Sequence, residues 1–112
     1  MDTKEQLKLL NKEIDEKTYQ RNLIYSIENE LNSLNHNIKE CINLISSSVK
    51  GKKANEIINN LTEENKKIAV QCNNTILEDK QKINNNLNEL NNHQTLLQEK
   101  LRQEEEEEKD NK

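Results

Sequence analysis

The feature that most constrains this chain is its single break, because it holds one glycine, Gly51, and no proline in 112 residues. Sheets, sandwiches and compact enzyme folds need turn residues at regular intervals, and this sequence lacks them. Serines at 46–48 precede the glycine, and serine competes with helix by bonding its own backbone. A glycine directly after such residues is typical of a helix C-terminus. We therefore expect two helices, over residues 3–48 and 53–105.

Apolar residues recur along both arms with the alternating three and four spacing of a coiled-coil seam. In the first arm the predicted seam is Leu7, Leu10, Ile14, Lys17, Arg21, Ile24 and, after a phase shift of one residue, Ile27, Leu31, Leu34, Ile38, Cys41 and Ile45. In the second arm it is Ala54, Ile58, Leu61, Asn65, Ile68, Cys72, Ile76, Ile83, Leu87, Leu90, Gln94, Leu97 and Leu101. Two arms of similar length joined by a short break predict an all-α fold, an antiparallel two-helix hairpin with its turn at about Gly51.

Polar residues also occupy seam positions of the second arm, at Asn65 and Gln94. A buried amide costs stability and can fix register. The chain holds twenty Asn in total, so we expect composition bias to account for them.

The formal net charge of −4 belongs to the end of the chain. Residues 104–108 and Asp110 supply six negative charges, Lys109 and Lys112 supply two positive ones, and residues 1–103 are balanced. We expect residues 1–103 to form the hairpin and residues 104–112 to form an acidic, frayed tail.

Several partners and locations are disfavoured by composition. The balanced body offers no extended basic surface, and Tyr19 and Tyr25 are its only aromatic residues, so nucleic acid is not an expected partner. The longest apolar runs are three residues, too short for a transmembrane segment or a signal-peptide core. We expect a cytoplasmic protein, with export by a route that needs no cleavable signal peptide as the alternative.

No residue pattern predicts catalysis, a cofactor or a metal site. Metal-protease, phosphate-loop and CxxC motifs are missing from the sequence, and a hairpin has little concave surface for an active site. Cys41 and Cys72 occupy seam positions at different distances from the turn, so we expect two buried free thiols. His36 and His93 also lie at different heights, which argues against a zinc site.

Six apolar residues lie beside the predicted seam. Three of them on the first arm are separated by multiples of seven, so they share one face of that helix. A hairpin with one narrow seam is marginal by itself, so this second stripe predicts a further helical surface, from another protein or from a copy of this chain. Scattered surface leucine is the alternative. The candidate partner-facing residues are Leu9, Leu23, Leu44, Ile57, Leu77 and Leu96.

The residues at the break resemble a known family. Val49-Lys50-Gly51, followed by Ala54 and then by apolar residues at 57, 58 and 61, resembles the turn of the WXG-type helical hairpin proteins exported by type VII secretion systems. Val49 stands where that family has tryptophan. The chain is most similar to the small hairpins that accompany LXG-type toxins. The resemblance implies a chaperone or targeting factor for the helical N-terminal domain of such a toxin, with Val49, Gly51 and Ala54 as the turn motif.

Two functions remain open at this point. The first is a non-enzymatic accessory protein that docks on a larger helical protein, such as a type VII secreted toxin. The second is a self-associating structural coiled-coil subunit of a multi-protein assembly.

Overall fold

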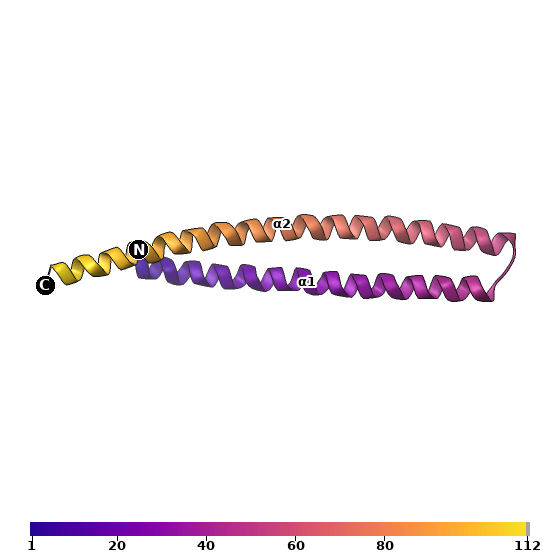
Figure 1. The fold of residues 1–112 in the computed structure, drawn as a ribbon, viewed down its shortest axis with the longest axis horizontal. Coiled ribbons are helices and arrows are strands. Elements are labelled where there is room, and N and C mark those ends of the chain that lie inside the picture. Colours follow the sequence, from indigo (N-terminus) through magenta and orange to yellow (C-terminus); the bar gives the residue numbers. More distant parts are fainter. Residues whose placement is uncertain (112) are drawn as a thin grey trace. The chain divides into compact units, whose positions relative to one another are not determined.

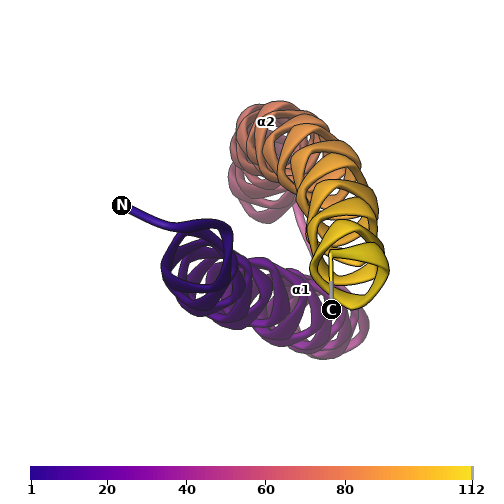
Figure 2. The same cartoon turned by 90° about the vertical axis from the view of Figure 1, so that its left-hand side faces the viewer.

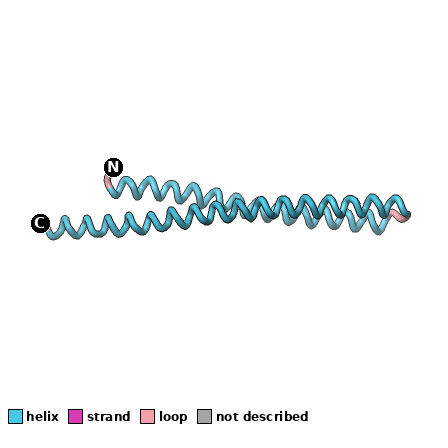
Figure 3. The backbone as a smooth tube through the Cα atoms, turned by 90° about the horizontal axis from the view of Figure 1, so that it is seen from above, coloured by secondary structure: helices cyan, strands magenta, loops and turns pink. Residues whose placement is uncertain are grey.

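The computed structural model describes residues 1–111 and consists of two long helices. Helix α1 spans Thr3–Ser48, 46 residues, and helix α2 spans Lys52–Asp110, 59 residues. Figure 1 shows one short turn joining them, and the tube in Figure 3 is helical apart from this turn and the chain ends. Residues 1–111 contain no strand. The predicted all-α helical hairpin is therefore confirmed, with the first helix at the bounds that the sequence indicated.

The start of α1 is capped by Asp2. Its Oδ1 atom accepts a hydrogen bond of 2.8 Å from the backbone N–H of Glu5. This satisfies one of the N–H groups that have no partner within a helix, and the Glu5 carboxylate lies in the first turn, where the helix dipole favours negative charge.

The turn depends on the conformation of Gly51. The Val49 N–H still donates to the Ile45 carbonyl, at 2.9 Å, and the Asn55 N–H donates to the Gly51 carbonyl, at 3.0 Å. Between these bonds Gly51 has a φ of 131°, which residues with a side chain rarely adopt. No heavy atom would lie within 4 Å of an added Cβ. The glycine is therefore required for its backbone angle and not for space.

Helix α2 ends five residues beyond the predicted boundary and includes the glutamate run as helix. Arg102 donates to Glu99 one turn before it and to Glu106 one turn after it, each at 2.6 Å. Glutamate has good helix propensity, and Lys109 places a cation in the last turn, where the dipole favours it. These interactions explain why residues 104–110 are helical. Lys112, the last residue of the predicted tail, lies outside the described residues.

Met1–Leu23 and Lys80–Lys112 form one compact unit, here called the terminal unit. The Thr3 hydroxyl donates to the Glu104 carboxylate at 2.9 Å, and Gln94 Nε2 donates to Asn11 Oδ1 at 2.7 Å, so the helices are antiparallel. The apolar side chains that are buried here, 5 to 8% exposed, are Leu7, Leu10, Ile83, Leu87 and Leu97. Ile14, Leu90 and Leu101 pack against this core.

Residues 24–79 form the second compact unit, here called the turn unit. Its helices are also antiparallel, since Asn65 Nδ2 of α2 donates to Asn35 Oδ1 of α1 at 3.0 Å. Ile76 is the one buried apolar residue of this unit. Figure 2 views the helices from the end that holds both termini, and no third element lies beside them in the described part of the chain. Apart from Ile76, the apolar side chains of the turn unit are half-buried or exposed.

Candidate interaction surface

Helix α1 keeps a single heptad contact line along most of its length. Its members are buried or half-buried and recur every three or four residues as far as Asn35, as expected for a helix that contacts one neighbour, and Ile42 follows seven residues later. The line consists of Thr3, Leu7, Leu10, Ile14, Lys17, Arg21, Ile24, Glu28, Leu31, Asn35 and Ile42.

The predicted phase shift in α1 is wrong. Ile27 is 50% exposed, Leu34 is 54% exposed, and Cys41 is exposed as well. Each of these residues directly precedes a contact-line residue. Its side chain therefore points about 100° away around the helix axis, because the helix has about 3.6 residues per turn. A continuous helix keeps this angular relation, so a shift in the apolar pattern of the sequence does not move the contact line with it.

Two predicted seam residues of α2 are misplaced in the same way. Leu61 is 44% exposed and Ile68 is 57% exposed, while the residues directly after them, Thr62 and Ala69, are the half-buried ones. Thr62 and Ala69 thus belong to the contact line of α2, and each exposed residue again directly precedes a contact-line residue. Both helices of the turn unit therefore carry apolar residues next to the contact line and not in it.

The misplaced residues of both helices lie on the same side of the turn unit. In the heptad abcdefg, position g directly precedes the core position a of the next heptad. In an antiparallel coiled coil, position g of one helix faces position g of the other helix. Ile27, Leu34 and Cys41 occupy this position on α1, and Leu61 and Ile68 occupy it on α2. We call these five residues the apolar side.

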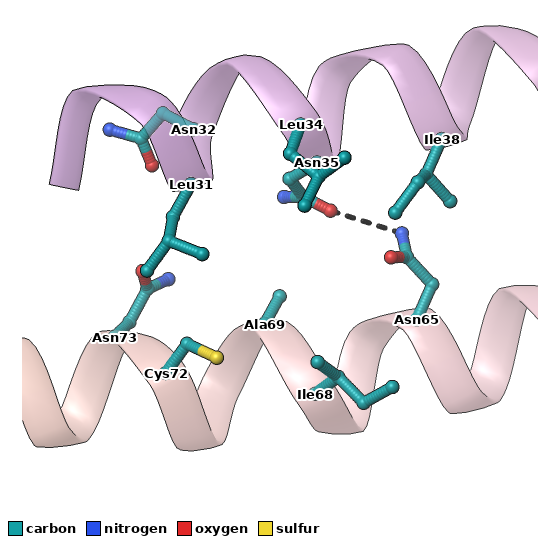
Figure 4. Close-up of a pocket in the computed structure, with 10 residues that line it drawn as sticks. All are labelled: Leu31, Asn32, Leu34, Asn35, Ile38, Asn65, Ile68, Ala69, Cys72 and Asn73. Atoms are coloured by element: carbon teal, nitrogen blue, oxygen red, sulfur yellow. Dashed lines mark hydrogen bonds between the residues drawn. The ribbon is translucent and has the colours of Figure 1, made fainter. Parts of the chain in front are cut away.

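A groove between the helices connects the apolar side with the core. Leu34 and Ile38 of α1 and Ile68 of α2 line the same hollow, together with the half-buried Ala69 and Cys72. In Figure 4, Leu31 and Ile38 point from α1 toward α2, and Ala69 points back toward α1. Aliphatic residues make up half of the lining, and four asparagines, at positions 32, 35, 65 and 73, make up most of the rest. The aliphatic part suits an apolar side chain from another helix.

The opposite side of the turn unit is polar. A second hollow between the same helices is lined by one apolar residue, Ile42, and by the polar residues Lys39, Asn43, Thr62, Asn65 and Lys66. The two sides of one helix pair thus differ in character. The polar side is suited to solvent, and the apolar side is suited to contact with protein.

The Asn35 and Asn65 pair lies in the groove lining and joins the helices (Figure 4). Gln94 likewise bonds Asn11 across the terminal unit. The amides at predicted seam positions therefore have partners on the other helix, and composition bias alone does not account for them. A hydrogen-bonded amide pair at the contact line fixes the register of two helices, at a cost in stability relative to an apolar pair.

The predicted partner-facing residues are all exposed: Leu9, Leu23, Leu44, Ile57, Leu77 and Leu96. Leu44 follows Cys41 by three residues and Ile57 precedes Leu61 by four, so helical spacing puts these two at the rim of the apolar side. Leu9, Leu23 and Leu96 belong to the terminal unit, where Leu9 and Leu23 keep the heptad position of Leu44, and Leu77 directly follows the buried Ile76. The signal that would have found the apolar side in the sequence is the repeat of apolar residues at 27, 34 and 41, which the periodicity assigned to the core.

The cysteines are both free thiols, but only one is covered. Cys72 is half-buried in the groove lining, whereas Cys41 is exposed on the apolar side, against the prediction that both are buried. No group of three or more potential metal-ligating side chains occurs among residues 1–111.

The resolved electrostatic perturbations lie at the far end of α2. Hydrogen bonding to the Arg102 guanidinium lowers the pKa of Glu99, and the same bond, with the charge of Glu106, raises the pKa of Arg102. All three groups are exposed, so this cluster stabilises the helix end locally and has no cavity in which to act on a ligand.

Val49, Gly51 and Ala54, the predicted turn motif, stay near one another at the turn, with Val49 exposed and Ala54 half-buried. Within the described residues, neither helix contains a stretch long and apolar enough to cross a membrane. Comparison with models of protein families, with curated proteins and with solved structures finds no match to this chain.

Proposed function

We propose that this protein is a non-enzymatic helical interaction protein that binds helices of another polypeptide through the apolar side of its turn unit. The observation that carries the proposal is the exposure of Ile27, Leu34 and Ile68 beside the groove between the helices. Apolar residues spaced at heptad intervals on one side of a helix pair are typical of a coiled-coil surface that accepts a further helix. The balanced charge of residues 1–103 gives no reason to expect nucleic acid as the partner.

In its most specific form, the proposal makes this chain an accessory or targeting partner of a larger helical protein, such as a type VII secreted toxin. Its support is the resemblance at Val49, Gly51 and Ala54 and the hairpin form of the two helices. The protein would then act in the cytoplasm or leave the cell with its partner without a cleavable signal peptide.

A self-associating coiled-coil subunit is the second candidate function. The observation that favours it is the match between rim residues of α1 and α2, since Leu44 and Ile57 lie at the same level of the hairpin and are both apolar and exposed. A surface whose two edges match in this way can accept its own copy.

Affinity capture with matched variants tests the proposal. The test variant carries Leu34→Gln and Ile68→Gln, and the control carries Tyr19→Gln and Val70→Gln, which are also exposed but lie off the apolar side. Co-expression with the helical N-terminal domain of an LXG-type toxin from the same genome tests the specific form. We expect the control and not the test variant to retain the helical partner. Equal retention by both variants contradicts the proposal.

A further inference from the structure

We propose that the apolar side of the turn unit is covered by a second copy of this chain, with both turns at the same end of the dimer. In this arrangement α1 of one copy lies over α2 of the other, which forms a four-helix bundle along the turn unit. This dimer rests on the proposed function, because both involve the same side of the hairpin. It differs in that the partner is a second copy of the chain.

The apolar side is large enough for such a contact. Residues 27–45 of α1 extend about 27 Å at about 1.5 Å per residue, and two adjacent helices are about 20 Å wide. The face therefore has a projected area of about 500 Å², and its corrugated accessible surface is larger. Two such faces together give about 1,000 Å², which reaches the roughly 1,000 Å² total expected of a biological interface and lies below the standard total of about 1,600 Å².

The rims of the face match in the proposed arrangement. A two-fold axis parallel to the helices places each α1 residue over the α2 residue at its own height, and the Asn35 to Asn65 bond gives that height directly. A residue of α1 and a residue of α2 in this unit therefore lie at the same height when their sequence numbers add up to about 100. The rim residues that then meet across the dimer are Leu44 with Ile57, Asn37 with Glu64, and Glu30 with Gln71.

Each of these rim contacts is favourable in kind. Leu44 and Ile57 are both exposed aliphatic residues. In the two other contacts a side-chain amide meets a carboxylate, so the amide can donate a hydrogen bond and no two glutamates are opposed. If the turns of the two copies lay at opposite ends of the dimer, the rims would not match. Leu44 and Ile57 of one copy would then lie toward the end at which the other copy carries Glu30 and Gln71.

The polar side limits the assembly to two copies. Lys39 and Lys66 line the opposite hollow, so a third copy would meet lysines where the second meets leucine and isoleucine. Each copy uses the same face to contact the other, so both faces are occupied once two copies have bound, and the assembly ends as a dimer.

Sedimentation equilibrium over a micromolar concentration series tests the occupant. We expect twice the chain mass of 13.2 kDa for the unchanged protein. Leu34→Gln with Ile68→Gln is expected to weaken the dimer at least tenfold, while Tyr19→Gln with Val70→Gln changes its Kd by less than twofold. Circular dichroism of each variant establishes that the helices remain. A monomer at every concentration, or equal dimerisation of both variants, overturns the inference.

Disulfide trapping tests the arrangement. In a Cys41→Ser, Cys72→Ser background, Leu44→Cys and Ile57→Cys are prepared as separate proteins, mixed and oxidised. We expect a covalent dimer from the mixture and much less from either protein alone, because Leu44 meets Ile57 of the other copy. Trapping of Leu44→Cys with itself in preference to the mixture overturns the proposed arrangement. A monomeric chain whose capture of a different helical protein still depends on Leu34 and Ile68 refutes the second copy and leaves the proposed function intact.

Discussion

The terminal unit and the turn unit are built from the same two helices, yet one is complete as a pair and the other is not. The difference lies at one heptad position of α1, which is occupied in turn by Glu13, Gln20, Ile27, Leu34 and Cys41. In the terminal unit this position is polar and borders solvent. In the turn unit it is apolar, so the contact between the helices ends in an apolar edge that neither helix covers.

The contact lines of both units contain polar residues, but they differ in how much apolar surface they bury. In the terminal unit, the contact line holds buried leucine and isoleucine, beside the half-buried Lys17 and Arg21. In the turn unit it includes Glu28 and the Asn35 to Asn65 pair, which contribute little apolar burial. A polar centre with an apolar edge is expected where register is fixed within the hairpin and stabilisation comes from a further helix. A two-helix hairpin can thus bury its apolar residues in one unit and leave apolar residues exposed beside the helix contact in the other.

The largest expected effect separates the two units by core truncation. Leu97→Ala removes a buried side chain of the terminal unit and is expected to cost about 2 to 4 kcal/mol of unfolding free energy. Leu34→Ala removes a half-exposed side chain and is expected to cost less than about 1 kcal/mol in the monomer. Urea denaturation at low protein concentration measures both. Equal costs would break the distinction between the two units.

The next largest effect concerns the turn. Gly51→Ala places a Cβ on a residue with a φ of 131°, and we expect a cost of about 1 to 2 kcal/mol from backbone strain alone, because no atom obstructs the Cβ. Denaturation of this variant beside Ser48→Ala, which changes the helix end and leaves the glycine in place, checks the cause. A neutral Gly51→Ala would mean that the turn adopts another backbone conformation.

A double-mutant cycle on each cross-helix amide pair sharpens the comparison further. Asn35→Ala with Asn65→Ala is expected to give a coupling energy of about 1 kcal/mol, as for a hydrogen bond that is partly shielded from water. Asn11→Ala with Gln94→Ala is expected to give less than about 0.5 kcal/mol, since that bond is exposed. Similar couplings in both cycles would argue against a register role specific to the turn unit.

The smallest expected effect lies at the end of α2. The hydrogen bond from Arg102 lowers the pKa of Glu99, so this carboxylate stabilises the helix end above its ordinary pKa, and the contribution is lost as pH falls through the lowered value. In Arg102→Gln we expect the pKa of Glu99 to rise toward the ordinary glutamate value, as read from an NMR titration of its side chain. A Glu99 titration that is the same in both proteins would contradict this contact.

Much of the fold follows from the sequence for simple physical reasons. One glycine, after three serines and without proline elsewhere, permits a single turn, and the bounds of α1 agree with that expectation. Leu7, Leu10 and Leu97 are buried as their spacing predicts. Where the apolar residues keep the same heptad register, their periodicity predicts both the helix and the face of it that is buried.

The candidate site was harder to predict, because periodicity identifies apolar positions and not the neighbour that covers them. Ile27, Leu34 and Cys41 have the heptad spacing of a core, and in a larger bundle they would be one. They are exposed here because the residues directly after them, Glu28, Asn35 and Ile42, are the half-buried ones. Similarly, the spacing of the sequence gives no partner for Asn65, because the Asn35 amide that accepts its hydrogen bond lies 30 residues away in the chain.

Amide hydrogen exchange of the monomeric protein, resolved residue by residue, tests the central claim most directly. If the terminal unit is complete and the turn unit is not, amides at residues 7–14 and 87–97 should exchange at least about tenfold more slowly than those at 31–42 and 58–69. The difference should shrink as the protein concentration rises and the apolar side becomes covered. Equal or greater protection of the turn unit in the monomer would contradict the account.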